Sequence, residues 1–248
     1  MKSLTCTSLF IIGIVMLISS CKKESAAVTK TVEFTTTSYD TLSTCDNLGK
    51  PDNLLTADAI SSPLLTFIDN TLPEKTDLRS SYPELLTTKA IADIAITQQS
   101  DVFITFVSQG TKFTNTFAFY TYPTSKPPAS TKDIITITHV FPNAGYLTTL
   151  KKGDKVKIGR FSPGTSIGFV LLKNGWNTTT STIDNKAVHF CSNDILNPEV
   201  DANLKKHAVL VNYPAESKVL IGFEDIDRTE STCDHDFNDL LVYCTVTP

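Results

Sequence analysis

From residue 91 to the C-terminus, the sequence repeats one pattern of short apolar or alternating runs that end at turn residues. Nine such runs occur, at residues 102–107, 115–122, 134–140, 155–161, 167–172, 187–190, 207–211, 219–225 and 240–246. A period of two is typical of strands, and no helical pattern separates the runs. The sequence therefore predicts a mainly β fold, an antiparallel two-sheet β-sandwich, and excludes a parallel α/β architecture.

The composition supports this prediction and excludes several classes of protein. The chain has 36 threonines, and β-branched side chains fit the pleated surface of a sheet. Hydrophobic residues make up 41% and charged residues 19%, so the chain is neither collagen-like nor a highly charged disordered protein. Because the net charge is -4 and no basic stripe occurs, nucleic acid is not an expected partner.

A segment before the strands has helical rather than alternating spacing. Its apolar residues are Leu54, Ala57, Ile60, Leu64, Leu65, Ile68 and Leu72. Pro63 interrupts this segment, and Ser62 can cap a helix whose first position suits proline. We therefore expect one or two short N-terminal helices, the second ending at about residue 70.

The first 21 residues resemble a bacterial lipoprotein signal. Lys2 precedes an apolar run over residues 9–18 that is too short to span a bilayer. The run ends in Ile18-Ser19-Ser20-Cys21, which resembles a lipobox, so we expect residues 1–20 to be removed and Cys21 to be lipidated. Its acyl chains would anchor the protein to a membrane without a transmembrane helix.

The residues after Cys21 predict where the anchored protein lies. Lys22-Lys23-Glu24 resembles the export tag of surface lipoproteins in some Gram-negative bacteria. We therefore expect an outer membrane lipoprotein at the cell surface, with the periplasmic face as the alternative. Residues 21–50 are rich in Ser, Thr and Lys and are interpreted as a lipidated tether, which leaves residues 51–248 as a single β-sandwich domain.

Four cysteines remain in the mature chain besides Cys21, namely Cys45, Cys191, Cys233 and Cys244. An exported protein folds in an oxidising compartment, so at least one disulfide is expected. Four cysteines allow three complete pairings, and their spacing does not choose among them. No spacing of cysteine and histidine indicates a zinc site.

The strongest chemical signal is a run of acidic residues between the last two predicted strands. Residues 224–239 contain Glu224, Asp225, Asp227, Glu230, Asp234, Asp236 and Asp239 against one basic residue, Arg228. If the two strands pair as a hairpin, Glu224 and Asp225 lie near Asn238 and Asp239. Carboxylates so close repel one another, so the cluster needs a cation or must spread apart.

Calcium is the cation that these residues favour. In Asp234-His235-Asp236-Phe237-Asn238-Asp239, oxygen donors alternate with other side chains, so that Phe237 can pack away from the donors. Hard oxygen ligands select Ca²⁺ over transition metals, and the spacing is not that of an EF-hand. The predicted ligands are Glu224, Asp225, Asp234, Asp236, Asn238 and Asp239. Two alternatives stay open: a solvated acidic loop, and a catalytic carboxylate pair of a glycan-active hydrolase.

Other residues carry weaker signals. Gly164-Thr165-Ser166-Ile167-Gly168 matches the hydrolase G-x-S-x-G pattern, but a strand-like run follows Ser166, so we reject it as a nucleophile. The ring of Trp176 could stack on a sugar or fold over the end of the core. Three histidines lie in or beside apolar strands, where structural roles are expected, and a fourth neighbours the acids. They are His139, His189 and His207, and then His235.

Several stretches together resemble one known family: residues 102–122, 140–144, 153–159, 164–176, 197–199, 206–209, 222–225 and 234–239. They are similar to the C-terminal domain of LruC-type bacterial envelope proteins, the domain of unknown function four-one-one-four. The likeness covers roughly residues 75–248. The five predicted acidic ligands and Asn238 fall on the family's signature residues, whereas Thr111-Lys112 departs from its pattern. The resemblance implies an extracytoplasmic β domain and supplies no established activity.

These expectations combine into one prediction. The chain is expected to be a surface-anchored, non-catalytic lipoprotein whose calcium-stabilised β-sandwich serves as a binding or structural module. Its expected partners are a membrane, through the lipid anchor, and a surface glycan or protein.

Overall fold

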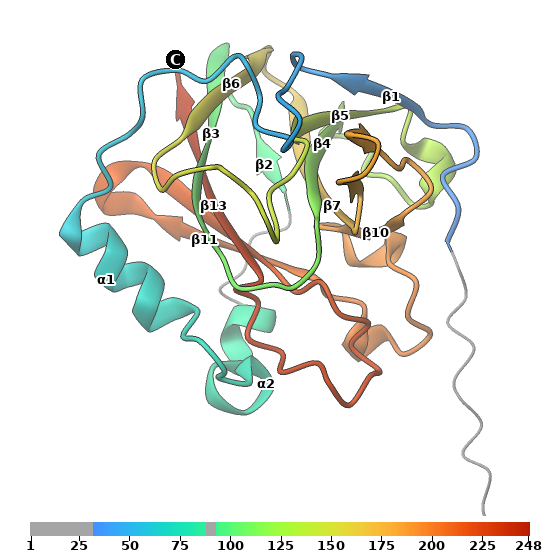
Figure 1. Ribbon diagram of the computed structural model, residues 1–248. Coiled ribbons are helices and arrows are strands. Elements are labelled where there is room, and N and C mark those ends of the chain that lie inside the picture. Colours follow the sequence, from blue (N-terminus) through green and yellow to red (C-terminus); the bar gives the residue numbers. More distant parts are fainter. Residues whose placement is uncertain (1–31, 88–92) are drawn as a thin grey trace, which may run out of the picture.

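The structure, a computed structural model, describes residues 32–87 and 93–248 (Figure 1). The predicted signal peptide and the predicted lipidation site, Cys21, lie outside the described residues. Within the described part of the chain, every helix is too short or too polar to cross a membrane.

Two large sheets form the fold, with a small hairpin beside them (Figure 1). The first sheet has the strand order β1 (Ser38–Thr41), β5 (Thr136–Phe141), β4 (Thr116–Pro123), β7 (Thr165–Lys173) and β10 (Val188–Cys191), and β2 (Ile94–Ala95) also pairs with β7. The second has the order β11 (Ala208–Tyr213), β12 (Lys218–Phe223), β13 (Leu240–Thr247), β3 (Ser100–Gln109) and β6 (Lys155–Phe161). The hairpin is β8 (Trp176–Asn177) with β9 (Thr182–Ile183).

The predicted fold class is confirmed, because each of the nine predicted runs forms a strand and the sheets are mainly antiparallel. One pairing departs from this rule: β1 runs parallel to β5.

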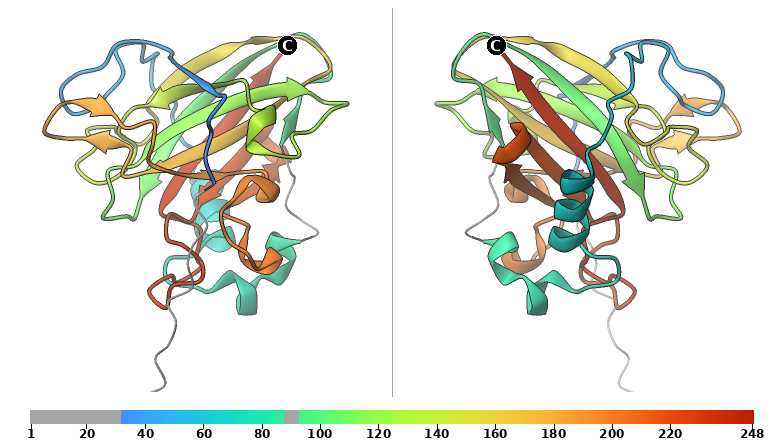
Figure 2. Two further views of the ribbon diagram at one scale, coloured as in Figure 1. Left: turned by 90° about the vertical axis from the view of Figure 1, so that its right-hand side faces the viewer. Right: turned by 90° about the vertical axis from the view of Figure 1, so that its left-hand side faces the viewer.

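Alternation along the strands divides the core into separate apolar clusters. In β13, Leu240 and Val242 face the space between the sheets, whereas Leu241 and Tyr243 face α1 (Ser62–Thr71). The right-hand view of Figure 2 shows α1 lying across this sheet. In β7 of the other sheet, Phe169 and Leu171 face the same central space, while Val170 faces a third cluster on the outside. Because both sheets are covered on their outer faces, their strands have apolar residues on both sides.

The helices follow the expected capping with a shift of one residue. Ser61, not Ser62, caps α1, because its Oγ accepts a hydrogen bond from the Leu64 N–H (3.1 Å). The expected helical piece before Pro63 does not form, since Leu55 bridges to Lys155 of β6 instead. The remaining helical turns are α2 (Leu78–Ser81) and the 3-10 turns η1 (Pro83–Leu86), η2 (Thr131–Asp133), η3 (Asp194–Leu196), η4 (Ala202–Leu204) and η5 (Pro214–Glu216).

Part of the predicted tether belongs to the folded domain. Strand β1 lies within residues 21–50 and pairs with β5 in the register Ser38↔Thr136 to Thr41↔His139. The hydroxyl of Tyr39 also lies 2.9 Å from His189 Nε2. The fold therefore includes residues that precede the predicted domain boundary at residue 51.

The expectation of a disulfide is wrong for the four cysteines that the structure describes, because all four are free. Cys244 packs between the two sheets, whereas Cys191 packs in the outer cluster of the first sheet. Cys233 lies in the acidic loop, and Cys45 is half-buried near the N-terminus of the fold. The cysteines thus sit in different environments, and burial raises the pKa of the Cys191 and Cys244 thiols.

Candidate metal site

The acidic residues meet where β12 ends and β13 begins. The two strands are antiparallel, and Phe223 pairs with Leu240, so Glu224 and Asp239 are the next residues at the same end of the ladder. The hydrogen bond from the Asp225 N–H to Asp239 Oδ2 (2.9 Å) joins the two sides. This confirms the hairpin-like arrangement that the sequence predicted for the two ends of the acidic run.

The loop between these strands is held in place by Phe237. Its side chain is fully buried in the apolar cluster under α1 and lies beneath the guanidinium of Arg228, 5.0 Å from the ring centroid. The backbone at His235 and Phe237 has φ of +59° and +58°, a conformation that non-glycine residues rarely adopt. Gly222 permits the close approach, since a Cβ there would lie 2.3 Å from the Phe237 carbonyl oxygen. Phe237 therefore packs away from the acids, as expected.

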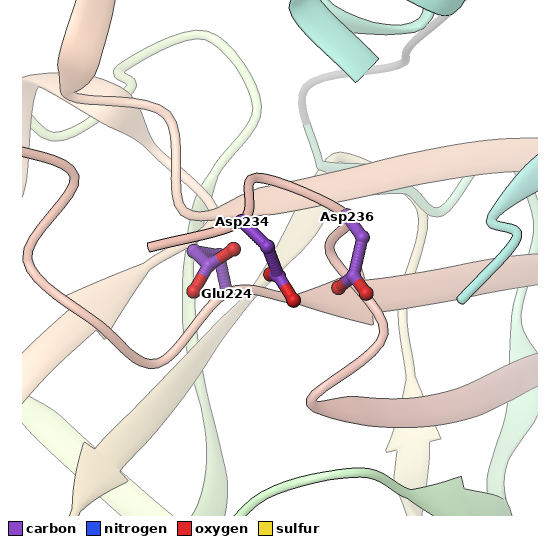
Figure 3. Close-up of side chains that lie close together, drawn as sticks. All are labelled: Glu224, Asp234 and Asp236. Atoms are coloured by element: carbon purple, nitrogen blue, oxygen red, sulfur yellow. The ribbon is translucent and has the colours of Figure 1, made fainter. Parts of the chain in front are cut away.

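Five carboxylates converge at this position, in two overlapping sets. Ligand atoms of Glu224, Asp234 and Asp236 all lie within 4.8 Å of one another. Figure 3 shows the Asp234 side chain between the other two. A second set with the same spacing consists of Glu224, Asp225 and Asp239. The acidic side chains thus point toward shared positions instead of spreading into solvent.

Two of these acids are completely buried and only partly hydrogen bonded. Glu224 and Asp225 are each 0% exposed. Oε1 of Glu224 accepts from the Ile226 N–H (3.3 Å), and Oδ2 of Asp225 accepts from Asn115 Nδ2 (2.5 Å). The other oxygens, Glu224 Oε2 and Asp225 Oδ1, are buried without a hydrogen-bond partner. A buried carboxylate oxygen without a donor is costly, and a bound cation would satisfy it.

Electrostatics at the site favour binding of a positive charge. Burial raises the pKa of Glu224, Asp225 and Asp236. The pKa of Asp239 rises to about 10, first because of burial and then because of the charges on Asp225 and Glu224. These four carboxyl groups are therefore harder to ionise here than in water, and a divalent cation would lower their pKa values by attracting the ionised forms.

Asn238, the sixth predicted ligand, is directed toward α1. Its side-chain amide donates to the Leu72 carbonyl oxygen at 3.4 Å, and its backbone N–H donates to Asp236 Oδ1 at 3.1 Å. The histidine of the loop, His235, is turned toward Arg228, with its Nδ1 3.2 Å from the guanidinium Nε. The structure thus brings the five predicted carboxylates together and uses Asn238 to hold the loop.

Several residues that support the site come from distant parts of the sequence and were not predicted. Asn115 contacts Asp225 from the turn before β4, and the Lys75 N–H donates to Asp236 Oδ2 at 2.8 Å. Nδ1 of buried His207 donates to the Glu224 carbonyl oxygen (2.8 Å), while its Nε2 lies 2.6 Å from Glu199 Oε1. The stretches that contain Glu199 and His207 belong to the family resemblance, and His207 was also expected to have a structural role, but neither was predicted to support the acids.

Two other candidates from the sequence lie elsewhere and are structural. Trp176 is only 2% exposed, so its ring is buried and cannot stack on a ligand at the surface. Ser166 lies within β7, and its hydroxyl is 2.9 Å from Thr124 Oγ1. The strand after it confirms that the G-x-S-x-G pattern is not a nucleophile elbow.

Comparison with known families gave a match over the part of the chain that contains the acidic loop. Residues 161–247 match the family model of a domain of unknown function (DUF4114). The match confirms the resemblance found in the sequence over a narrower range, from the end of β6 through β13. The matched residues contain the whole acidic loop and all six predicted ligands. Comparisons with curated proteins and with solved structures gave no match.

Proposed function

We propose that this protein is a lipid-anchored outer membrane protein at the cell surface whose β-sandwich is a non-catalytic binding or structural module stabilised by Ca²⁺. The observation that carries the calcium site is the meeting of five carboxylates around buried oxygens of Glu224 and Asp225 that lack hydrogen-bond donors. The anchor is proposed from the lipobox-like Ile18-Ser19-Ser20-Cys21. A surface glycan or protein is the proposed partner class.

The donor set favours calcium among the common metal ions. Both sets consist of carboxylates alone, and hard oxygen donors suit Ca²⁺ or Mg²⁺ rather than zinc or copper. Calcium accepts six to eight oxygens in flexible geometry, whereas Mg²⁺ requires a near-ideal octahedron. Five carboxylates from two strand ends and an irregular loop suit the more flexible ion.

Hydrolysis by a carboxylate pair fits the geometry less well. Glycosidases keep their two carboxyl groups about 5–9.5 Å apart beside the sugar that they cleave. Here one oxygen of each acid in a set lies within 4.8 Å of an oxygen of the others, and Glu224 and Asp225 are fully buried, away from any sugar at the surface. If the protein were nevertheless a glycan-active hydrolase, activity on glycan substrates would be detected for the wild type and lost in Asp236→Asn.

The melting temperature of the protein is expected to be about 5–10 °C higher in millimolar Ca²⁺ than in EDTA. A ligand at 100 times its dissociation constant adds about 2.7 kcal/mol of stability, and for a domain of this size each kcal/mol corresponds to about 2–4 °C. The measurement is a thermal melt of the full-length chain in detergent, with EDTA or millimolar Ca²⁺.

Matched variants make this test specific. Asp236→Asn should reduce the calcium-dependent shift, whereas Glu230→Gln, which removes an exposed acid of the same loop, should retain it in full. Equal melting temperatures of the wild type in EDTA and in Ca²⁺ would remove calcium from the proposal.

Replacement of Cys21 by serine is expected to release the protein from the membrane, because serine cannot carry the thioether-linked lipid. Acyl chains contribute about 0.8 kcal/mol per buried CH₂ group, and their loss leaves no other proposed anchor. The measurement is the distribution of the wild type and Cys21→Ser between membrane and soluble fractions, with metabolic labelling by an alkyne fatty acid. Membrane retention of the unlabelled variant would contradict the proposed anchor.

A further inference from the structure

We propose that the site binds two calcium ions and that Glu224 is shared between them. This inference rests on the proposed calcium function and extends it. The first ion would lie among Glu224, Asp234 and Asp236, and the second among Glu224, Asp225 and Asp239.

The size of a calcium coordination sphere separates the two positions. Calcium binds oxygen at about 2.3–2.6 Å, so oxygens bound to one ion with bonds near 2.4 Å lie within about 4.8 Å of one another. Each set of three satisfies this limit. Across the described residues, however, the five carboxylates form two such sets and not one set of five. A single ion therefore cannot reach all five acids in this arrangement, whereas two ions with one common ligand can.

Each set also includes a residue with a buried oxygen that lacks a hydrogen-bond partner. Glu224, which belongs to both sets, has the unpartnered Oε2, and Asp225, of the second set, has the unpartnered Oδ1. A carboxylate has about four lone-pair sites, so the hydrogen bond from the Ile226 N–H to Glu224 Oε1 at 3.3 Å leaves lone pairs of this side chain that can face two ions. Both proposed ion positions thus include at least one acid with a buried oxygen that has no hydrogen-bond partner.

The charge of the cluster is consistent with two ions. If all five carboxylates are ionised, one divalent cation would leave three of their negative charges without compensation inside the cluster, and two cations would leave one. Two basic residues outside the cluster interact electrostatically with its acids, Arg228 with Glu224 and Lys173 with Asp225. The Arg228 guanidinium is held by the Lys206 carbonyl oxygen at 2.9 Å, and the Lys173 ammonium lies over the Phe113 ring, 4.2 Å from its centroid.

The stoichiometry of calcium binding tests this proposal. Equilibrium dialysis of the full-length chain in detergent against radioactive Ca²⁺ should give two ions per chain. Asp234→Asn and Asp239→Asn should each give one, because each removes a ligand of a different ion. Glu224→Gln should lower the calcium affinity of both sites by more than about 100-fold. Loss of a residue that only hydrogen bonds to a metal ligand already lowers metal affinity about 10–100-fold. Glu230→Gln serves as the control and should still bind two.

The possible outcomes separate the two proposals. One ion in the wild type would overturn the shared site and leave the calcium function standing, whereas no bound ion would overturn both. Two ions in Glu224→Gln would also overturn the shared site. Near-UV circular dichroism checks that each variant is folded. If Glu224→Gln does not fold, Asp234→Asn still decides the question, because Asp234 is exposed and its loss leaves the buried acids in place.

Discussion

Replacement of Phe237 by alanine is expected to lower the free energy of unfolding by about 3–5 kcal/mol, the usual cost of truncating a buried phenylalanine. The side chain is fully buried among the residues that join α1 to the second sheet. A domain of this kind is stable by only about 5–15 kcal/mol, so the change removes a large share of the total. Chemical denaturation of the wild type and the variant measures it.

The same substitution should also weaken calcium binding, because Phe237 lies between Asp236 and Asn238 and holds the loop that presents Asp236. Phe237→Leu is the matched control, since it keeps most of the apolar volume and should cost less than half as much as alanine. A loss below about 1 kcal/mol in Phe237→Ala would show that the loop is not anchored through this side chain.

Acidification from pH 7 to pH 4 is expected to destabilise the protein through His139 and His189. Burial lowers the pKa of each imidazole from 6.5 to about 4. The carbonyl of Ala187 accepts from His189 Nδ1 (2.7 Å), so the neutral ring leaves Nε2 to accept from the Tyr39 hydroxyl. Because the fold favours the neutral form, this stability is complete above pH 6.5 and is lost as the pH falls through about 4. Each histidine contributes roughly 3 kcal/mol.

The variant His139→Phe tests this pH dependence. Phenylalanine keeps a ring beside Tyr39, which stacks on His139 with ring centroids 5.9 Å apart, and it cannot be protonated. The free energy of unfolding should therefore fall about 3 kcal/mol less between pH 7 and pH 4 in the variant than in the wild type. Burial raises the pKa of Asp93 to about 6, which acts in the opposite direction, but this contribution is common to both proteins and cancels. An equal loss in both proteins would exclude His139 as a source of acid sensitivity.

The sequence predicted the strands well because alternation is a local property, and it failed where structure depends on distant contacts. Strand β1 was missed because four residues with one apolar side chain, Tyr39, carry too little pattern. The helical piece before Pro63 was expected because Leu54 and Ile60 have helical spacing. In the structure Leu54 packs between the sheets and Ile60 packs under α1, so the two residues serve different clusters.

The sequence was enough to predict the five acids of the candidate site, but not their division into two sets. Glu224 and Asp239 flank strands that pair with each other, so their proximity followed from the hairpin alone. The division of the acids into two sets depends on the path of the loop, which the buried Phe237 and the left-handed backbone at His235 determine. The supporting residues Asn115 and His207 are brought in by other strands, and no local pattern links them to the acids.

Strand β13 separates the acidic site from the end of the chain. Asp239 immediately precedes this strand, and Pro248 follows it at the opposite end of the strand (Figure 1). Eight extended residues span about 26 Å, so a fluorophore or affinity label fused after Pro248 would stand well clear of the acids. The C-terminus is therefore a suitable place for immobilising the protein with its acidic end facing free solution.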